Sequence, residues 1–237
     1  MTKLDIRDLV IAHGKNTILT DITLGSFTPG SVVGVLGPNG VGKSSFLRSL
    51  AGLAPYGGSV TLDGDENRKL SHNQRARKVA YLPQTLPQAT NLVAYEAVIS
   101  ACRAVRHDLP HDHVEELAER IFDRLNIRHI AFQPLNRMSG GQRQMVGLAQ
   151  ILVREPDIML LDEPTNHLDV DSREALIAAL NSYEGAVVLV SHDPHLVELV
   201  CDTLLVVQDG TCQPFEGDLK EYRQSLQDAR RKRRAPV

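Results

Sequence analysis

Short apolar runs alternate with polar and glycine-rich turns near the start of the chain. Each run is too short for a helix and is rich in Ile, Leu and Val, which is typical of strands joined by hairpins. The pattern predicts antiparallel strands within residues 3–33 and another strand at Ser59–Gly64. The apolar runs are Leu9–Ile11, Ile18–Leu19 and Ile22–Leu24.

Five further runs are almost entirely apolar and end at a polar residue or a turn. Strands that are apolar throughout are buried on both faces, as in parallel sheets covered by helices. Charged groups that follow such a strand lie at its carboxyl end, where α/β sheets bind their ligands. The runs cover residues 31–36, 79–82, 158–161, 187–190 and 203–207.

Helical spacing of apolar residues replaces this pattern in the middle of the chain. Residues 93–105 and 114–125 both show it, so we predict a helical insertion over about residues 91–131. Another helix is expected from Ser139 through Ile151, because serine is a good N-cap and the paired glycines leave backbone N–H groups open to an anion. A last helix is predicted from Leu219 to Arg234.

An eight-residue loop that suits a triphosphate follows the apolar run at 31–36. A triphosphate needs several inward-pointing backbone N–H groups, and glycines form such a turn without side chains in the way. Lys43 can reach the β- and γ-phosphates, and the hydroxyl of Ser44 can ligate Mg²⁺. The loop consists of Gly37, Pro38, Asn39, Gly40, Val41, Gly42, Lys43 and Ser44.

Two other apolar runs end in groups that suit chemistry on a phosphate. The run 158–161 is followed by Asp162 and Glu163, and the run 187–190 by Ser191 and then His192. At the crevice of an α/β sheet, Asp162 is expected to face a metal ion and Glu163 the attacking water.

Histidines and cysteines do not show metal-ligand spacing. The three histidines near Pro110 are interpreted as solvated loop residues rather than a metal site. The three cysteines are an odd number without a C-x-x-C pair, so packed thiols are expected instead of disulfides or zinc. These residues are His107, His111, His113, Cys102, Cys201 and Cys212.

Composition indicates a soluble globular protein and excludes disordered and fibrous classes. The 237 residues are 42% hydrophobic and 23% charged. No run approaches the roughly 18 apolar residues of a membrane span, and Met1–Asp5 lack the apolar core of a secretion signal. We therefore expect a cytoplasmic location.

Charge is unevenly placed along the chain. Residues 220–234 hold seven positive and two negative side chains, a balance of +5, so the net charge of −3 leaves −8 for the rest. A basic tail on an acidic body can contact RNA or anionic lipid, although a solvated, fraying terminus has the same composition.

Taken together, these motifs resemble those of the ATP-binding cassette (ABC) ATPase family along essentially the whole chain. Residues 37–44 match the Walker A loop, with Ser45 after it, and residues 158–162 match the Walker B strand. Gln84 matches the Q-loop, and Glu163 matches the catalytic glutamate. Asp169, after Leu168, matches the D-loop, and His192 matches the switch histidine. The signature sequence is matched by Ser139, Gly140, Gly141 and Gln142.

The resemblance implies an α/β fold, a P-loop NTPase (RecA-like) core with an N-terminal antiparallel β subdomain and an inserted α-helical subdomain. It implies one nucleotide-binding domain over residues 1–237. Within it, the catalytic core with the β subdomain covers 1–90 and 148–213, the helical subdomain covers about 91–147, and a C-terminal helix with the basic tail covers 214–237. The implied cofactors are ATP and Mg²⁺, with Ser44, Gln84 and Asp162 toward the metal.

The resemblance also implies a composite ATP site. In this family two domains pair head to tail, and each ATP lies between Walker A of one and the signature sequence of the other, so the expected partner is a second copy in a homodimer. Two positions depart from the pattern: Met138 replaces a leucine before the signature, and His13 stands where a tyrosine usually stacks on adenine. Weaker base selectivity is expected from the smaller imidazole face.

Different parts of the chain resemble different branches of the family. Residues 30–155 look like ATPase subunits of bacterial importers of ferric siderophores, haem or cobalamin, whereas Leu160–Leu226 look like ABC-F proteins, which act on ribosomes. An importer subunit implies an integral membrane permease as partner, a solute-binding protein acting indirectly, and a place on the inner face of the cell membrane.

Three functions follow from these features. The leading hypothesis is a transport-coupled ATPase. ABC-F proteins normally carry two cassettes and a charged linker in one chain, whereas this sequence shows one set of motifs. The alternative is an ATPase that acts on ribosomes or RNA. A nucleotide-binding scaffold without turnover is disfavoured because Glu163 and His192 are both present. Divergence or a chimeric origin would each explain why two parts of the chain resemble different branches of the family. The sequence does not identify the transported solute.

Overall fold

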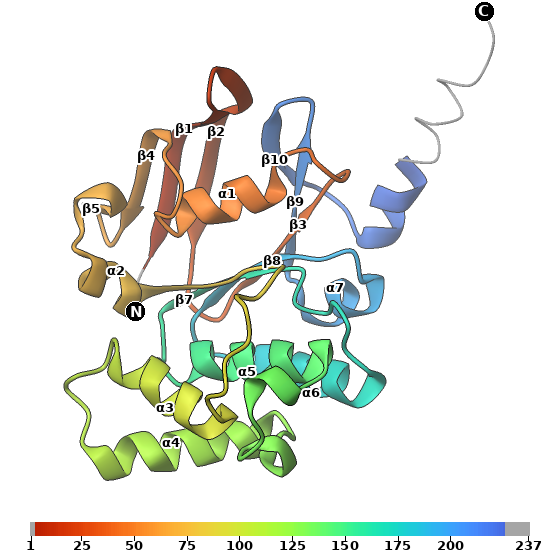
Figure 1. The fold of residues 1–237 in the computed structure, drawn as a ribbon. Helices are drawn as coiled ribbons and strands as arrows, with labels where there is room; N and C mark the ends of the chain where they lie inside the picture. Colours follow the sequence, from red (N-terminus) through yellow and green to blue (C-terminus); the bar gives the residue numbers. More distant parts are fainter. Residues whose placement is uncertain (1–2, 226–237) are drawn as a thin grey trace, which may run out of the picture.

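A computed structural model describes residues 3–225 of the chain. Its strands form two separate sheets, one of four strands and one of six, and most helices gather on the far side of the larger sheet (Figure 1). This confirms the predicted α/β fold.

The four-stranded sheet is antiparallel and has the strand order β2-β1-β4-β5. Its longest pair is the hairpin predicted from the alternating runs near the start of the chain, and inward residues such as Leu9 and Ile22 pair across it. The strands are β1 (Leu4–His13), β2 (Asn16–Phe27), β4 (Gly57–Leu62) and β5 (Asp65–Glu66).

The six-stranded sheet has the order β10-β9-β3-β8-β7-β6 and is parallel except for its edge strand β10. All residues of its three central strands are buried, as the unbroken apolar runs predict. The strands are β3 (Val32–Leu36), β6 (Val79–Leu82), β7 (Ile158–Asp162), β8 (Ala186–Val190), β9 (Thr203–Gln208) and β10 (Thr211–Phe215).

Helices pack on both faces of the larger sheet. One helix, α1, lies between the two sheets, and its fully buried Phe46 and Leu47 pack with residues of both. Helices α3, α4, α5, α6 and α7 cover the opposite face. The bounds are α1 (Lys43–Leu50), α2 (His72–Lys78), α3 (Ala94–Arg103), α4 (His111–Arg124), α5 (Gly140–Leu152), α6 (Val170–Asn181) and α7 (Pro194–Val200), with 3-10 turns at Asn67–Lys69, Arg128–Ile130 and Leu135–Arg137.

The predicted helical insertion is present as α3 and α4. Helix α4 begins earlier than expected, so the prediction that His111 and His113 are loop residues was wrong, although both are exposed. Pro110 is the N-cap, a position where a missing N–H costs nothing, and the ion pair from His111 Nδ1 to Glu115 Oε1 at 3.1 Å spans the first turn.

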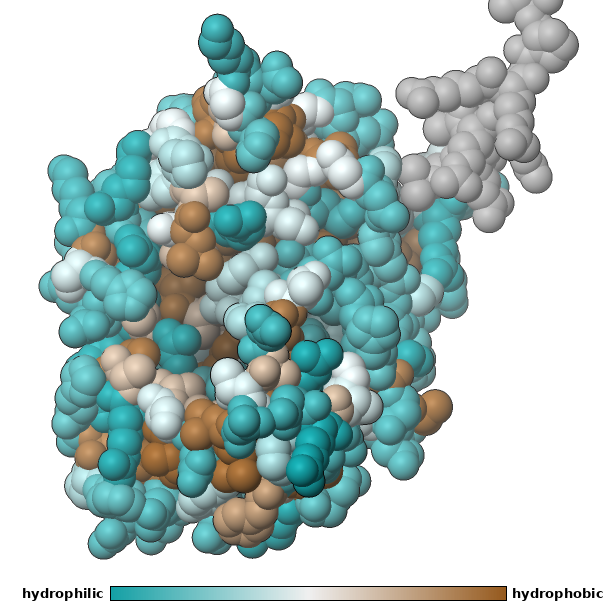
Figure 2. All heavy atoms as spheres, in the orientation of Figure 1, coloured by the Kyte–Doolittle hydropathy of each residue, from teal (hydrophilic) through white to brown (hydrophobic). Residues whose placement is uncertain are grey.

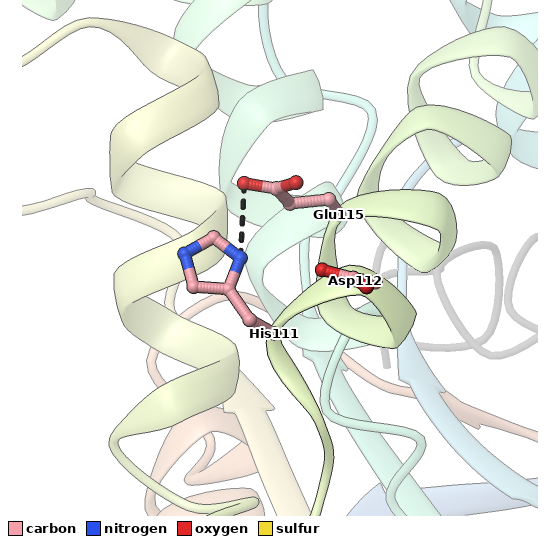
Figure 3. A group of neighbouring side chains, drawn as sticks. All are labelled: His111, Asp112 and Glu115. Carbon is pink, nitrogen blue, oxygen red and sulfur yellow. Dashed lines mark ion pairs between the residues drawn. The ribbon is translucent and has the colours of Figure 1, made fainter.

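Figure 3 shows that the imidazole of His111 and the carboxylate of Glu115 face each other, with Asp112 beside them. Ligand-type atoms of these three residues lie within 4.8 Å of one another. His111 and Asp112 are exposed, and solvated side chains often gather in this way at the start of a helix, so we assign no metal site here.

The C-terminal helix is present from 219 to 225, where the described residues end. Its predicted continuation to Arg234 and most of the basic tail lie outside the described residues. Among the described residues, no helix has the length and apolarity that crossing a bilayer requires. The subdomain bounds stay a prediction.

Candidate functional site

The phosphate loop connects β3 to α1 at the carboxyl end of the parallel sheet. Gly37 has φ 148°, and a Cβ atom there would lie 2.3 Å from the carbonyl oxygen of Val207. Only glycine fits such a backbone next to a neighbouring strand. The start of the loop therefore lies directly against β9.

Lys43 begins α1, and its side chain reaches back into the loop. Its side chain is nearly buried, and Nζ donates to the carbonyl oxygens of Gly37 and Pro38, each at 2.9 Å. Burial lowers the pKa of Lys43 below its ordinary value, and the nearby carboxylates of Glu163 and Asp162 oppose this shift. The ammonium is thus positioned inside the loop where an anion would bind.

Asp162 ends strand β7 beside the loop and is only 2% exposed. Its Oδ1 accepts a hydrogen bond from the Ser44 hydroxyl at 3.1 Å, although the two residues are 118 positions apart. Its Oδ2 accepts one from the Tyr81 hydroxyl at 3.0 Å. The structure therefore brings together the serine and aspartate that the sequence assigned to the metal.

Glu163 is fixed from two sides. Its own N–H donates to the carbonyl oxygen of Val190 at 2.8 Å, which ties it to the end of β8. Its Oε2 accepts from the backbone N–H of His192 at 3.1 Å, and its Oε1 lies 3.2 Å from His192 Nε2. Burial raises the pKa of Glu163, which makes its carboxylate a better proton acceptor when it is ionised.

Glu163 also has a backbone φ of 52°, in the left-handed region. This backbone conformation is sterically unfavourable for a residue other than glycine. Residues that adopt it often occur at functional sites. The turn directs the side chain across to His192 rather than along the strand.

These groups line one cavity of about 450 Å³. Most of the predicted site residues therefore meet in one place. The cavity is lined by Ile18, Asn39, Gly40, Gly42, Lys43, Ser44, Ser45, Gln84, Asp162, Glu163, Val190 and His192. A neighbouring cavity of about 820 Å³ lies between the other side of the loop and the C-terminal helix, and Gly37, Pro38 and Val41 line it.

Other predicted residues do not line either of these cavities. His13 is exposed near the tip of the β1–β2 hairpin, and Asp169 caps α6 by accepting from the Ser172 N–H at 2.8 Å. The signature residues form the start of α5. Ser139 Oγ accepts from the Gln142 N–H at 3.1 Å, and Gln142 Oε1 accepts from the Ser139 N–H at 3.0 Å.

Gly141 makes a close approach that fixes this start of α5. A Cβ atom at Gly141 would lie 2.4 Å from the carbonyl oxygen of His167, which precedes Leu168 and Asp169. The beginning of α5 therefore rests on the loop that leads into α6.

Two residues at the site belong to none of the sequence motifs. Ile18 of β2 lies over the loop, where its Cγ2 would be 2.7 Å from a Cβ at Gly42. Tyr81 stands on β6, and its pairing with Leu160 of β7 places it on the same face as Asp162. The sequence does not show which strand lies beside β7, so no local signal pointed to this contact.

Comparison with known families decides what this site belongs to. Residues 19–166 match the ABC transporter family. The chain is a member of the ABC transporter family. Members bind and hydrolyse ATP, so the chain is an ABC ATPase.

Curated relatives come from both branches that the sequence resembles. The chain is 35% identical over 221 residues to the hemin import ATP-binding protein HmuV of Pseudomonas putida, covering 90% of this chain and 86% of that protein. It is 38% identical over 226 residues to the probable ATP-binding protein YheS of Escherichia coli K12, and 33% over 233 residues to the energy-dependent translational throttle protein EttA of Mycobacterium tuberculosis. These matches cover 92% and 89% of this chain but only 32% of YheS and 41% of EttA.

A solved structure supports the fold. CbiO1 of Clostridium perfringens, described as part of the ABC transporter complex cbiONQ, superposes with a TM-score of 0.78 at 26% identity. The match covers 96% of this chain and 93% of CbiO1.

Proposed function

We propose that this ABC ATPase is the subunit that drives a membrane importer, and that it works as a homodimer on the inner face of the cell membrane. The observation that carries the proposal is a groove next to Gln84, formed where the strand-to-helix segment after β6 meets α3 and α5. It consists of two adjoining cavities of about 440 and 430 Å³.

The groove is lined mainly by apolar side chains and also by several cationic ones. Leu86 and Pro87 line both cavities, and Leu53 and Leu92 at its edges are 55% and 40% exposed. Figure 2 shows a hollow between the upper and the lower part of the molecule. Hydrophobic side chains gather in this hollow and below it. The cations that line it are His72 (when protonated), Arg75, Arg143 and Arg154, and no Asp or Glu is among its described lining residues.

This combination fits a protein segment better than RNA. Single-stranded RNA binds through aromatic side chains that stack on bases, whereas the groove is mainly aliphatic. An acidic and apolar segment of a permease would neutralise the arginines and cover the exposed leucines. Because Gln84 lines the ATP cavity and its neighbour in the chain, Pro83, lines the groove, the proposed partner site directly adjoins the nucleotide site.

The geometry of the ATP cavity supports hydrolysis. We assign Lys43 and the loop amides to the β- and γ-phosphates, and Glu163 to the water that attacks the γ-phosphate. His192 holds the carboxylate of Glu163 in place and lies at the mouth of the cavity, with 53% of its side chain exposed. Glu163 then accepts the proton that the water loses.

The donor set next to the loop fits Mg²⁺. The Ser44 hydroxyl and the Asp162 carboxylate are in hydrogen-bond contact, and Gln84 lines the same cavity, so the three residues offer hard oxygen donors to one cavity. We propose that these residues hold Mg²⁺. The ion would neutralise negative charge on the β- and γ-phosphate oxygens.

The position of the signature residues supports a dimer. Ser139 and Gly140 are at the start of α5 and do not line the ATP cavity, but Ser139 still has a hydroxyl proton to donate while its oxygen caps the helix. A helix N-terminus of this kind attracts a phosphate. A second copy would supply that phosphate from its own ATP.

The class of solute is proposed from similarity. HmuV is described as a hemin import protein, and the first two thirds of the chain resemble importers of iron siderophores, haem or cobalamin. We propose a solute of this kind, delivered to the permease by a solute-binding protein.

Affinity purification of the tagged chain from detergent-solubilised cells tests the importer proposal. A multi-span membrane protein should copurify in stoichiometric amount. The substitution Leu86→Glu in the groove should abolish copurification, whereas Phe132→Glu should preserve it, because Phe132 is 78% exposed but does not line the groove. Equal recovery with both variants would contradict docking in the groove.

Similarity to EttA favours a second candidate, an ATPase that acts on ribosomes or RNA. The basic stretch at 220–234 supports it. In the same purification this function would give ribosomal proteins and rRNA instead of a membrane protein, and the recovery would fall when the stretch is neutralised.

A further inference from the structure

Asp162 has two hydrogen-bond donors, one on each carboxylate oxygen. Ser44 binds Oδ1 at 3.1 Å, and Tyr81 binds Oδ2 at 3.0 Å. Among the hydrogen bonds of the described residues, these two reach the Asp162 side chain. A buried carboxylate needs such partners, because burial without them is costly.

The two donors differ in what else they are expected to do. Ser44 is itself an expected ligand of the cation, so its contact with Asp162 competes with metal binding. Tyr81 stands on a neighbouring strand, in the paired position opposite Leu160. It is therefore the donor that can hold Asp162 whether or not the cation is bound.

Tyr81 lies between the groove and Asp162 of the ATP cavity. Its ring lines the groove beside Leu82 and Pro83, and the hydroxyl is the only polar group of the side chain. The hydroxyl donates to Asp162 Oδ2 at 3.0 Å, so its single proton is directed at the carboxylate.

We propose that Tyr81 is a positioning residue for the cation site: its hydroxyl fixes the rotation of the Asp162 carboxylate and leaves Oδ1 directed toward Ser44 and the metal. Without this contact the carboxylate is free to rotate, and part of the binding free energy of the cation is spent on ordering it. The inference concerns the isolated chain and does not depend on the importer proposal.

Binding of Mn²⁺, used as a paramagnetic probe of the cation site in the presence of ADP, tests the role of Tyr81. The substitution Tyr81→Phe should weaken Mn²⁺ binding about tenfold, the loss that a hydrogen bond to a charged group of ~1.4 kcal/mol gives. The affinity for ADP measured in EDTA should change less than about twofold, because the phosphate loop is untouched.

Tyr56→Phe is the matched control. The Tyr56 hydroxyl also donates to a carboxylate, Glu66 Oε1 at 3.0 Å, but in the four-stranded sheet away from the ATP cavity. Both variants should lose stability, whereas only Tyr81→Phe should lose Mn²⁺ affinity. If the two variants weaken Mn²⁺ binding equally, or if Tyr81→Phe leaves it unchanged, the positioning role is wrong.

A double-mutant cycle guards against a general effect on folding. In an Asp162→Asn background, where the carboxylate is gone, Tyr81→Phe should cause no further loss of Mn²⁺ affinity. An additive loss in the double variant would show that Tyr81 acts on the site by another route and would overturn the proposal.

Discussion

His192 and Glu163 contact each other twice, once through the imidazole and once through the backbone. Nε2 of His192 lies 3.2 Å from Oε1 of Glu163, and the N–H of His192 donates to Oε2 at 3.1 Å. The pair joins the ends of β7 and β8, so the proposed base is held by the neighbouring strand.

We expect Glu163→Gln to abolish steady-state ATP hydrolysis and to preserve ATP binding. The amide has nearly the same shape and can still accept from the His192 N–H, but it cannot take a proton from water. Phosphate release and binding of a fluorescent ATP analogue measure the two effects. Hydrolysis near the wild-type rate would show that Glu163 is not the base.

His192→Ala should lower turnover about 10²- to 10⁴-fold and leave ATP affinity nearly intact. The imidazole contacts Glu163 and lines the cavity, whereas the loop amides and Lys43 carry the phosphate contacts. The check is kcat from steady-state kinetics beside a Kd from calorimetry. A large loss of affinity with unchanged kcat would assign His192 to binding instead.

Lys43→Ala should weaken ATP binding, because it removes the charge placed inside the phosphate loop. Lys43 is 7% exposed, so its interaction with a phosphate is poorly screened. Calorimetry should show about tenfold or greater loss. As a control, Lys15→Ala in the exposed β1–β2 turn should leave the affinity unchanged.

The composite site predicts that two inactive chains restore activity together. Ser139→Arg blocks the signature end of α5, and Lys43→Ala disables the phosphate loop, so each homodimer should be inactive. A mixed dimer contains one site with both elements intact, and part of the activity should return on mixing. The safer measurement is ATP-dependent dimerisation of Glu163→Gln by size-exclusion chromatography, where a persistent monomer would contradict the composite site.

Acid stability should depend on Glu66. Burial raises the pKa of this carboxyl, but hydrogen bonds from Ser59, Tyr56 and the Val60 N–H, with the charge of Arg68, bring it below the ordinary value. A depressed pKa gives stability that is present above the unfolded pKa and is lost as the pH falls through the folded one.

Glu66→Gln should therefore lower the free energy of unfolding by ~1–2 kcal/mol at neutral pH, and the difference from wild type should shrink below about pH 4. Urea denaturation at several pH values measures it. Glu198→Gln, at an exposed position on α7, is the matched control and should follow the wild-type curve.

Strand prediction from the sequence worked best where an apolar run was unbroken. The runs at 158–161 and 187–190 became β7 and β8, because only a strand covered on both faces buries every side chain. Helices with a weak apolar stripe were missed. Helix α2 (His72–Lys78) has no buried residue, and α7 begins with a proline that suits a first turn but gives no periodic signal.

The candidate site was predicted in its parts but not in its contacts. Ser44 and Asp162 were each predicted to face the metal ion, and the structure places them in hydrogen-bond contact. The Tyr81 contact depends on which strand lies beside β7 and in which register. Such lateral order is set by long-range packing and is not visible in local periodicity.

Because a Cβ atom at Gly141 would lie 2.4 Å from the carbonyl oxygen of His167, the glycine lets the start of α5 pack directly against the loop that leads into α6. Ser139 lies two residues before Gly141, and Asp169 lies two residues beyond His167. In the proposed dimer, this contact would couple one ATP site to the other. Gly141→Ala is thus expected to disturb the cooperativity between two ATP molecules while leaving each isolated phosphate loop intact.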